Sequence, residues 1–96
     1  MSLDEIVKVL NLHKNEIANC YKVKNIGVFG SYAKHENTAA SDIDILVDFT
    51  TPVGWEFLDL KEYLENLLEL EVDLVTPNAL KKQMKESVIS STVFIK

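Results

Sequence analysis

The chain has 96 residues, 47% of them hydrophobic, which suits one small domain spanning residues 1–96 with a packed core. Its ten lysines, fifteen acidic residues and lack of arginine give a net charge of −5 at pH 7. Proteins that hold long nucleic acids neutralise the phosphates with clustered lysine and arginine, and the only basic cluster here is Lys81, Lys82 and Lys85. The composition therefore argues against a long RNA or DNA substrate. It favours a small anion held with a cation, or a basic protein partner.

The sequence shows no signal for a membrane or for secretion. No apolar run approaches the ~18 residues of a membrane span, and no basic and apolar leader begins the chain. The single cysteine, Cys20, excludes an internal disulfide and fits a reducing compartment. We therefore expect a cytoplasmic protein with no membrane partner.

A helix, a strand and a helical turn are expected in the first third of the chain. Ser2 and Glu5 have the spacing of a capping box that begins the helix. The apolar stripe of this helix consists of Leu3, Ile6, Val7, Leu10, Ile17 and Cys20. Residues 24–29 then read as a strand that Gly30 ends, and residues 31–34 as the first turn of a short helix.

The clearest strand is expected over residues 41–49, after a polar loop at 35–40. Its apolar and acidic side chains alternate with period two, which places them on opposite faces. The mostly acidic face holds Asp42, Asp44, Leu46 and Asp48, and the apolar face holds Ile43, Ile45, Val47 and Phe49. We interpret Asp48 as a solvent-facing residue, and a turn with Pro52 follows the strand.

The last part of the chain predicts two helices around one more strand. Residues 55–70 have a helical pattern whose inner face consists of Phe57, Leu60, Leu64, Leu67 and Leu68. Residues 71–76 read as a third strand, and Asn78 is expected to cap a last helix through about Val88. The tail, 90–96, fits a strand or a docked coil. The predicted fold class is α+β (mixed α/β), a small three- to four-stranded mixed sheet packed with helices.

Three features of the sequence carry candidate chemistry. Gly30-Ser31 joins a strand to a helical turn, where glycine lets a phosphate approach the backbone and the free N–H groups favour an anion. Asp42 and Asp44 project from one strand face, ~6.6 Å apart at the backbone, and a magnesium ion relieves the repulsion between such acids. Asp73, inside the third strand, must point to solvent or into a site. Taken singly, each feature also fits a solvated surface without a ligand.

Taken together, these features form a known pattern. The stretch GSYAKHENTAASDIDILVDF, followed further along by EVDLVTP, closely resembles the minimal nucleotidyltransferases of the polymerase-beta-like superfamily. The pattern of that family is Gly-Ser, a spacer, Asp-x-Asp, and a third Asp on the next strand. The likeness runs over essentially the whole chain and implies a nucleotidyltransferase fold with magnesium-dependent nucleotidyl transfer.

The resemblance also implies a role for each matching residue. Gly30 and Ser31 would hold the nucleoside triphosphate, with ATP as the expected donor. Asp42, Asp44 and Asp73 would bind magnesium, and Asp73 would help to deprotonate the attacking hydroxyl. In-line attack builds negative charge on the entering and leaving oxygens, which a pair of metal ions held by these acids would stabilise.

The chain departs from the family pattern after Gly-Ser-x-Ala, where Lys34-His35 stands in place of Arg-Gly. Lys34 keeps a positive charge for a phosphate contact but loses the bidentate fork of arginine. His35 lacks the flexibility of glycine and, like His13 in the first helix, is interpreted as a surface residue. The departure bears on the catalytic rate more than on the fold.

A partner is implied as well. Free-standing minimal nucleotidyltransferases commonly pair with an all-helical HEPN-type ribonuclease toxin, and act as its antitoxin by transferring AMP from ATP to a toxin tyrosine. Two alternatives stay open: a non-catalytic module that neutralises its partner by contact, and transfer to a small molecule in a pocket built by a homo-oligomer. Trp55 and Phe57, with the tail segment 93–95, fit either core packing or a partner surface. The base preference and the oligomeric state stay undetermined.

Overall fold

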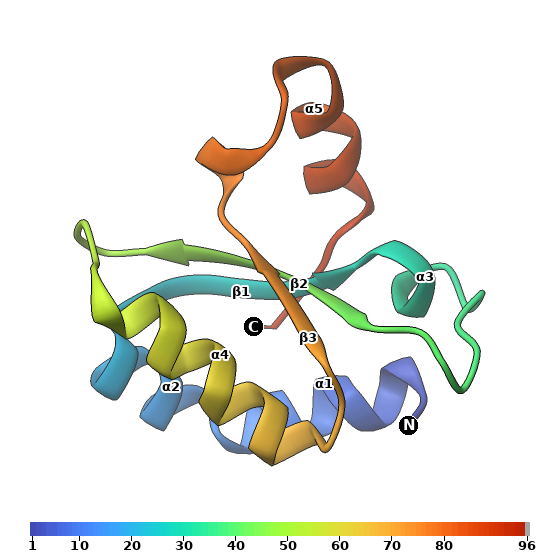
Figure 1. Ribbon diagram of the computed structural model, residues 1–96, viewed down its shortest axis with the longest axis horizontal. Helices are drawn as coiled ribbons and strands as arrows, with labels where there is room; N and C mark the ends of the chain where they lie inside the picture. Colours follow the sequence, from blue (N-terminus) through green and yellow to red (C-terminus); the bar gives the residue numbers. More distant parts are fainter. Residues whose placement is uncertain (96) are drawn as a thin grey trace.

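The computed structural model describes residues 1–95 and contains a four-stranded sheet (Figure 1). The strand order is β3 (Val72–Val75), β2 (Ile43–Phe49), β1 (Val23–Phe29) and β4 (Val93–Phe94). β1 is antiparallel to both of its neighbours, β2 and β4, whereas β2 and β3 are parallel. The sheet is therefore mixed, which confirms the predicted fold class. Of the tail expected as strand or docked coil, residues 93–94 form β4, whereas Ser90 and Ser91 belong to the last helix, which ends later than predicted. Lys96 lies outside the described residues.

Three helices cover one face of the sheet: α1 (Leu3–Leu12), α2 (Lys14–Tyr21) and α4 (Trp55–Leu68). α5 (Lys82–Ser91) stands on the opposite side of the sheet (Figure 1). Because alternate residues of a strand point to opposite faces, β1 and β2 can bury one apolar face against the helices and keep the other for polar groups. The side chains enclosed between the two layers include Ile6, Leu10, Ile17, Val28, Ile43, Ile45, Val47, Leu60 and Leu64. Within residues 1–95, no helix combines the length and the apolar character that a membrane crossing requires.

The N-terminal helix is interrupted, which the sequence did not predict. The capping box forms as expected, since the Glu5 N–H donates to Ser2 Oγ at 3.3 Å and the Ser2 N–H donates to Glu5 Oε1 at 3.1 Å. The helix then breaks at His13, which ends α1 and begins α2 with φ −104° and ψ 11°. The predicted stripe nevertheless continues across the break to Ile17, which is buried in α2, and it ends before Cys20, which is exposed.

His13 itself is not the surface residue that the sequence predicted. It is half-buried, and its ring meets the ring of Tyr63 edge to face with the centroids 6.5 Å apart. This contact joins the junction of α1 and α2 to α4, and edge-to-face packing is a favourable arrangement for aromatic rings.

β2 begins at Ile43, later than the strand predicted from Ser41. A tight turn delays it, because the Ser41 N–H donates to the Thr38 carbonyl at 3.1 Å and the Thr38 N–H donates to Ser41 Oγ at 2.8 Å. The ladder to the neighbouring segment starts where the Ile43 N–H donates to the Glu71 carbonyl at 3.0 Å. Asp42 is therefore placed just before the strand and not within it.

The start of the last helix was also predicted wrongly. Asn78 lies in a separate 3-10 turn, η1 (Pro77–Ala79), and α5 begins only after Lys81. The backbone of Leu80 and Lys81 is extended, with ψ values of 139° and 143°, so the turn after Pro77 does not continue into a helix. Lys81 provides no side-chain cap for α5.

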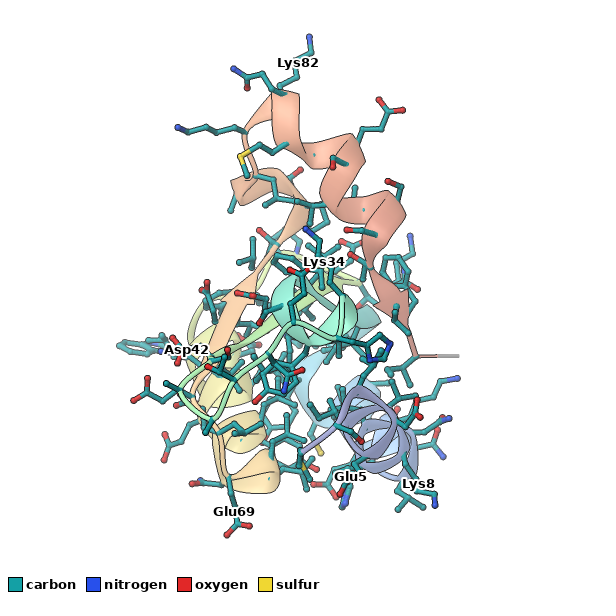
Figure 2. The ribbon with its side chains drawn as sticks, turned by 90° about the vertical axis from the view of Figure 1, so that its right-hand side faces the viewer. Glu5, Lys8, Lys34, Asp42, Glu69 and Lys82 are labelled. Atoms are coloured by element: carbon teal, nitrogen blue, oxygen red, sulfur yellow. The ribbon has the colours of Figure 1, made fainter. Side chains whose placement is uncertain are left out.

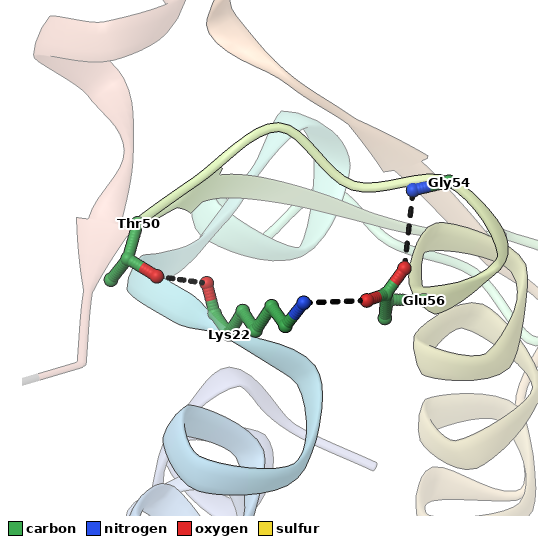
Figure 3. Close-up of polar contacts among 4 residues, drawn as sticks. All are labelled: Lys22, Thr50, Gly54 and Glu56. Atoms are coloured by element: carbon green, nitrogen blue, oxygen red, sulfur yellow. Dashed lines mark hydrogen bonds and ion pairs between the residues drawn. The ribbon is translucent and has the colours of Figure 1, made fainter.

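A small polar network fastens the loop between β2 and α4 (Figure 3). Lys22 Nζ pairs with Glu56 Oε2 at 3.0 Å, and the Gly54 N–H donates to Glu56 Oε1 at 3.1 Å. The backbone N–H and the hydroxyl of Thr50 both donate to the Lys22 carbonyl, at 2.9 and 3.3 Å. Backbone hydrogen bonding of Glu56, followed by the contact with Lys22, lowers the pKa of Glu56 to about 2. The network therefore ties the N-terminus of α4 to the residue that follows α2.

Candidate functional site

The turn at Gly30 forms the centre of the candidate site. Gly30 begins α3 (Gly30–Ala33) directly after β1, and its φ of +72° lies in the left-handed region that glycine favours. A Cβ built on Gly30 would overlap the carboxylate of Asp44, and the Asp44 Cγ would lie only 2.9 Å from it. Gly30 is therefore required twice, by its backbone conformation and by the carboxylate packed against it. From the sequence, glycine at this position was expected only because it lets a phosphate approach the backbone. The contact with Asp44 is a further reason for glycine, which the sequence did not indicate.

The strand ladders bring two of the predicted acids together. Phe29, the last residue of β1, pairs with Asp44 of β2, and Asp44 pairs with Asp73 of β3. Neighbouring strands are about 4.8 Å apart, so paired side chains on one face lie side by side. Gly30, Asp44 and Asp73 thus form a row across the sheet, on the face opposite α1, α2 and α4.

The electrostatics of this row are unfavourable without a cation. The pKa of Asp44 is raised from 3.8 to about 6, first by partial burial, then by the negative charge of Asp73 and a close carboxyl–carboxyl contact with it. The charge of Asp42 adds to this shift. A carboxyl group whose ionisation is opposed by burial and by like charges is stabilised in its ionised form by a bound metal ion.

Asp42 stands apart from the row. It is exposed and precedes β2, although its charge still reaches Asp44. Among residues 1–95, no group of three or more His, Cys, Asp or Glu side chains forms a ready-made metal cage. Mg²⁺ usually takes one or two carboxylates from a protein and completes its shell with water and substrate phosphates. The donor set of Asp44 and Asp73, with Asp42 nearby, therefore fits magnesium that binds together with a nucleotide.

α3 ends in a Schellman motif that explains the departure from the family pattern. The Glu36 N–H donates to the Ser31 carbonyl at 2.8 Å, and the His35 N–H donates to the Tyr32 carbonyl at 3.3 Å. His35 adopts a φ of +58° between these bonds and is exposed, as predicted. The motif needs a left-handed residue at this position and usually takes glycine. The glycine of the family pattern is therefore a helix terminator here, and His35 fills that position with some backbone strain.

One cleft lies beside the row, and a larger one lies at the other end of β2. The smaller, of about 370 Å³, is lined by Phe29, Gly30, Lys34, Gln83, Met84, Ser87, Val88 and Ser91. Figure 2 shows Lys34 between α3 and α5, and Lys82 at the outer tip of α5, pointing away from the rest of the molecule. We assign the candidate site to this cleft and the adjoining acids, because Gly30 connects them.

The larger cleft, of about 740 Å³, lies at the other end of β2. Its lining includes Asp48 and Lys85 and none of the site residues predicted from the sequence. Asp48, which was predicted to face solvent, is half-buried and lines this cleft.

The comparison with known families decides the classification. A model of the nucleotidyltransferase domain matches residues 10–95. The chain belongs to the nucleotidyltransferase domain family. A relative, protein adenylyltransferase MntA of Thermococcus cleftensis, is 44% identical over 96 residues, covering 99% of this chain and 97% of the relative. The resemblance inferred from Gly-Ser, Asp-x-Asp and the third Asp is thereby confirmed, and the chain is a nucleotidyltransferase.

Solved structures of this family share the fold. A protein assigned as a minimal nucleotidyltransferase matches with a TM-score of 0.82 and 28% identity, covering 97% of this chain and 95% of that one. A chain of a toxin–antitoxin structure with AMP-PNP matches with a TM-score of 0.71 and 25% identity. That match covers 100% of this chain and 73% of the other. The arrangement of strands and helices is therefore that of the nucleotidyltransferase fold.

The residues predicted from the sequence occupy different places in this nucleotidyltransferase. Ser31 is half-buried in the first turn of α3, beside Gly30, and Lys34 is exposed at the edge of the smaller cleft. Sequence reasoning missed the contribution of α5, which lines the cleft with Gln83 and Ser87. Their four-residue spacing indicates a shared helix face, but the sequence does not show that this face lies against α3.

Proposed function

We propose that this nucleotidyltransferase, acting as a single minimal domain, is a magnesium-dependent protein adenylyltransferase. Its acceptor is a tyrosine of a HEPN-type helical toxin, and the transfer of AMP from ATP makes the chain the antitoxin of that toxin. The observation that carries the proposal is the row of Gly30, Asp44 and Asp73 beside the cleft that Lys34 lines. The relative named MntA supports a protein acceptor, and the toxin–antitoxin structure with AMP-PNP supports both the donor and the partner class.

The two groups of site residues bind ATP in different ways: one contacts the triphosphate directly, and the other holds the magnesium ion. Ser31 and the backbone at Gly30 hold the triphosphate, and Lys34 forms an ion pair with a phosphate oxygen. Asp44 and Asp73, assisted by Asp42, hold magnesium, which when bound neutralises the phosphates and stabilises the leaving pyrophosphate. The net charge of −5 disfavours a long nucleic acid in this role, because such substrates bind through clustered cations.

The transfer itself is an in-line displacement. The tyrosine oxygen of the partner forms a bond to the α-phosphorus, the bond from the α-phosphorus to the bridging oxygen breaks, and pyrophosphate leaves. Asp73 accepts the proton of the tyrosine hydroxyl. The exposure of Asp73 supports this role, because an incoming side chain can reach it, whereas Asp44 is half-buried against Gly30.

Label transfer to the purified partner tests the proposal. The chain is incubated with magnesium, the toxin and ATP labelled at the α-phosphate, and the label on the toxin is measured with and without a tyrosine-to-phenylalanine change in the toxin. We expect label on the wild-type toxin. Asp44→Asn should reduce its rate of appearance on the order of a hundredfold or more, because the developing charge loses its support.

The competing functions appear as distinct outcomes of the same test. A stable complex without label, in which toxin activity is neutralised equally well by Asp44→Asn and the wild type, would establish a non-catalytic antitoxin. Lys34 in place of the family's arginine is the feature that favours this alternative. Label found on a small molecule and not on the toxin would establish a different acceptor.

A further inference from the structure

We propose that α5 forms the second wall of the phosphate-binding cleft, with the side chains of Gln83 and Ser87 donating hydrogen bonds to the β- and γ-phosphates of the nucleotide. The inference rests on the proposed function for the identity of the nucleotide. It adds binding residues on an element that the family pattern of Gly-Ser and three acids does not include.

The cleft between α3 and α5 places these side chains opposite the predicted phosphate ligands. Gly30 and Lys34 line one side of its volume of about 370 Å³, and Gln83, Ser87 and Ser91 line the other. The α5 residues are spaced by four, so they lie on one face of the helix, and that face is turned toward α3.

The polar side chains on this face differ in whether they already form a hydrogen bond within the chain. Ser91 Oγ donates to the Val88 carbonyl at 3.0 Å, within its own helix. Within residues 1–95, no intrachain hydrogen bond engages the side chain of Gln83 or Ser87. An amide and a hydroxyl can both donate to a phosphate oxygen, and bonds to charged acceptors are the stronger ones.

α5 contacts the rest of the molecule through half-buried side chains, Val88 and Ile89 among them. All of α5 lies within the described part of the chain, and none of its residues is buried. Toward the cleft it presents Met84 and Val88 as well as the polar side chains of Gln83, Ser87 and Ser91, which are exposed and able to donate to a polar ligand. The phosphates also need such donors, because the chain has no arginine and Lys34 is the basic residue of the lining.

Binding of magnesium pyrophosphate, measured by calorimetry, tests the proposal without any transfer step. We expect Ser87→Ala and Gln83→Ala each to weaken pyrophosphate binding roughly tenfold, as for a lost hydrogen bond to a charged group. Ser90→Ala is the matched control, since it removes the same hydroxyl from the same helix but from a residue outside the cleft lining. AMP, which lacks the β- and γ-phosphates, should bind all three variants as it binds the wild type.

The outcomes separate this inference from the proposed function. Equal pyrophosphate affinity in the wild type, Ser87→Ala and Gln83→Ala would overturn the role of α5, even if AMP transfer to the toxin is observed. A tenfold loss in these variants, with no label on any toxin, would support the role of α5 and overturn the adenylyl transfer. Absence of pyrophosphate binding by the wild type would overturn the role of α5, and the label-transfer test would then decide the proposed function by itself. Because the substituted side chains are exposed, the melting temperatures of the variants should match that of the wild type.

Discussion

The two ends of α3 both have a positive φ, but they place opposite constraints on the side chain. Gly30, the first residue of α3, has a φ of +72°, and His35, which follows the helix, has a φ of +58°. At Gly30 the Asp44 carboxylate occupies the space of a Cβ, whereas His35 is exposed and needs only the left-handed turn of the Schellman motif. The comparison shows that a glycine of the family pattern can be indispensable for two reasons or replaceable at a modest energy, depending on what packs against it.

The largest effect should come from Gly30→Ala. The variant combines a left-handed alanine with displacement of the Asp44 carboxylate, so we expect a loss of about 2–4 kcal/mol in the free energy of unfolding. Chemical denaturation measures this directly. A loss below about 1 kcal/mol would mean that the turn relaxes easily, and the distinction between the two ends of α3 would then disappear.

Asp44→Asn changes the carboxylate that packs against Gly30 and tests whether Asp44 holds the metal. The variant removes the repulsion from Asp73 and Asp42, so the protein without metal should be more stable, by about 1 kcal/mol at pH 7 after allowance for solvent screening of a half-buried group. Magnesium with ATP should raise the melting temperature of the wild type and leave that of the variant nearly unchanged. A normal ligand-induced shift in Asp44→Asn would place the metal elsewhere.

The pH dependence of stability follows from the same residue. The folded pKa of Asp44, about 6, lies above its ordinary value of 3.8, so the folded state binds more protons than the unfolded state between these values. The contribution of Asp44 to the free energy of unfolding should therefore fall as the pH rises from about 4 to about 7. The difference in free energy of unfolding between the wild type and Asp44→Asn, measured as a function of pH, isolates the contribution of Asp44. Groups such as Glu56, whose lowered pKa affects stability below pH 4.5, cancel in this difference. If the stability difference between the two proteins does not change with pH, the raised pKa of Asp44 is contradicted.

The smallest effect should come from His35→Gly. Glycine relieves the left-handed strain at the end of α3 but increases the flexibility of the unfolded chain, so we expect a net gain of about 0.5–1 kcal/mol. Denaturation midpoints of His35→Gly and His35→Ala, compared side by side, measure the gain against a control that keeps the strain. If His35→Gly is no more stable than His35→Ala, the Schellman motif does not explain why the family pattern has glycine at this position.

The sequence was informative wherever a short-range rule applied. The capping box at Ser2 and Glu5, the strand before Gly30 and the turn of α3 follow from local spacing, and all are present. Predictions failed where a local pattern continued past a break: one helix was expected through His13, and α5 was expected to begin at Asn78. Periodicity does not register a single non-helical residue, because the apolar residues on either side still fall near helical spacing.

The sequence by itself determined the family, because Gly-Ser, Asp-x-Asp and a third Asp at this spacing are specific in combination, and it predicted which residues form the site. Only the tertiary structure decided how these residues meet. The parallel pairing of β2 with β3 sets Asp73 beside Asp44, the antiparallel pairing of β1 sets Gly30 against it, and the late start of β2 leaves Asp42 outside the ladder. Strand register depends on the pairing of segments that are far apart in the sequence, so no local pattern specifies it. The same long-range pairings bring α5 to the cleft.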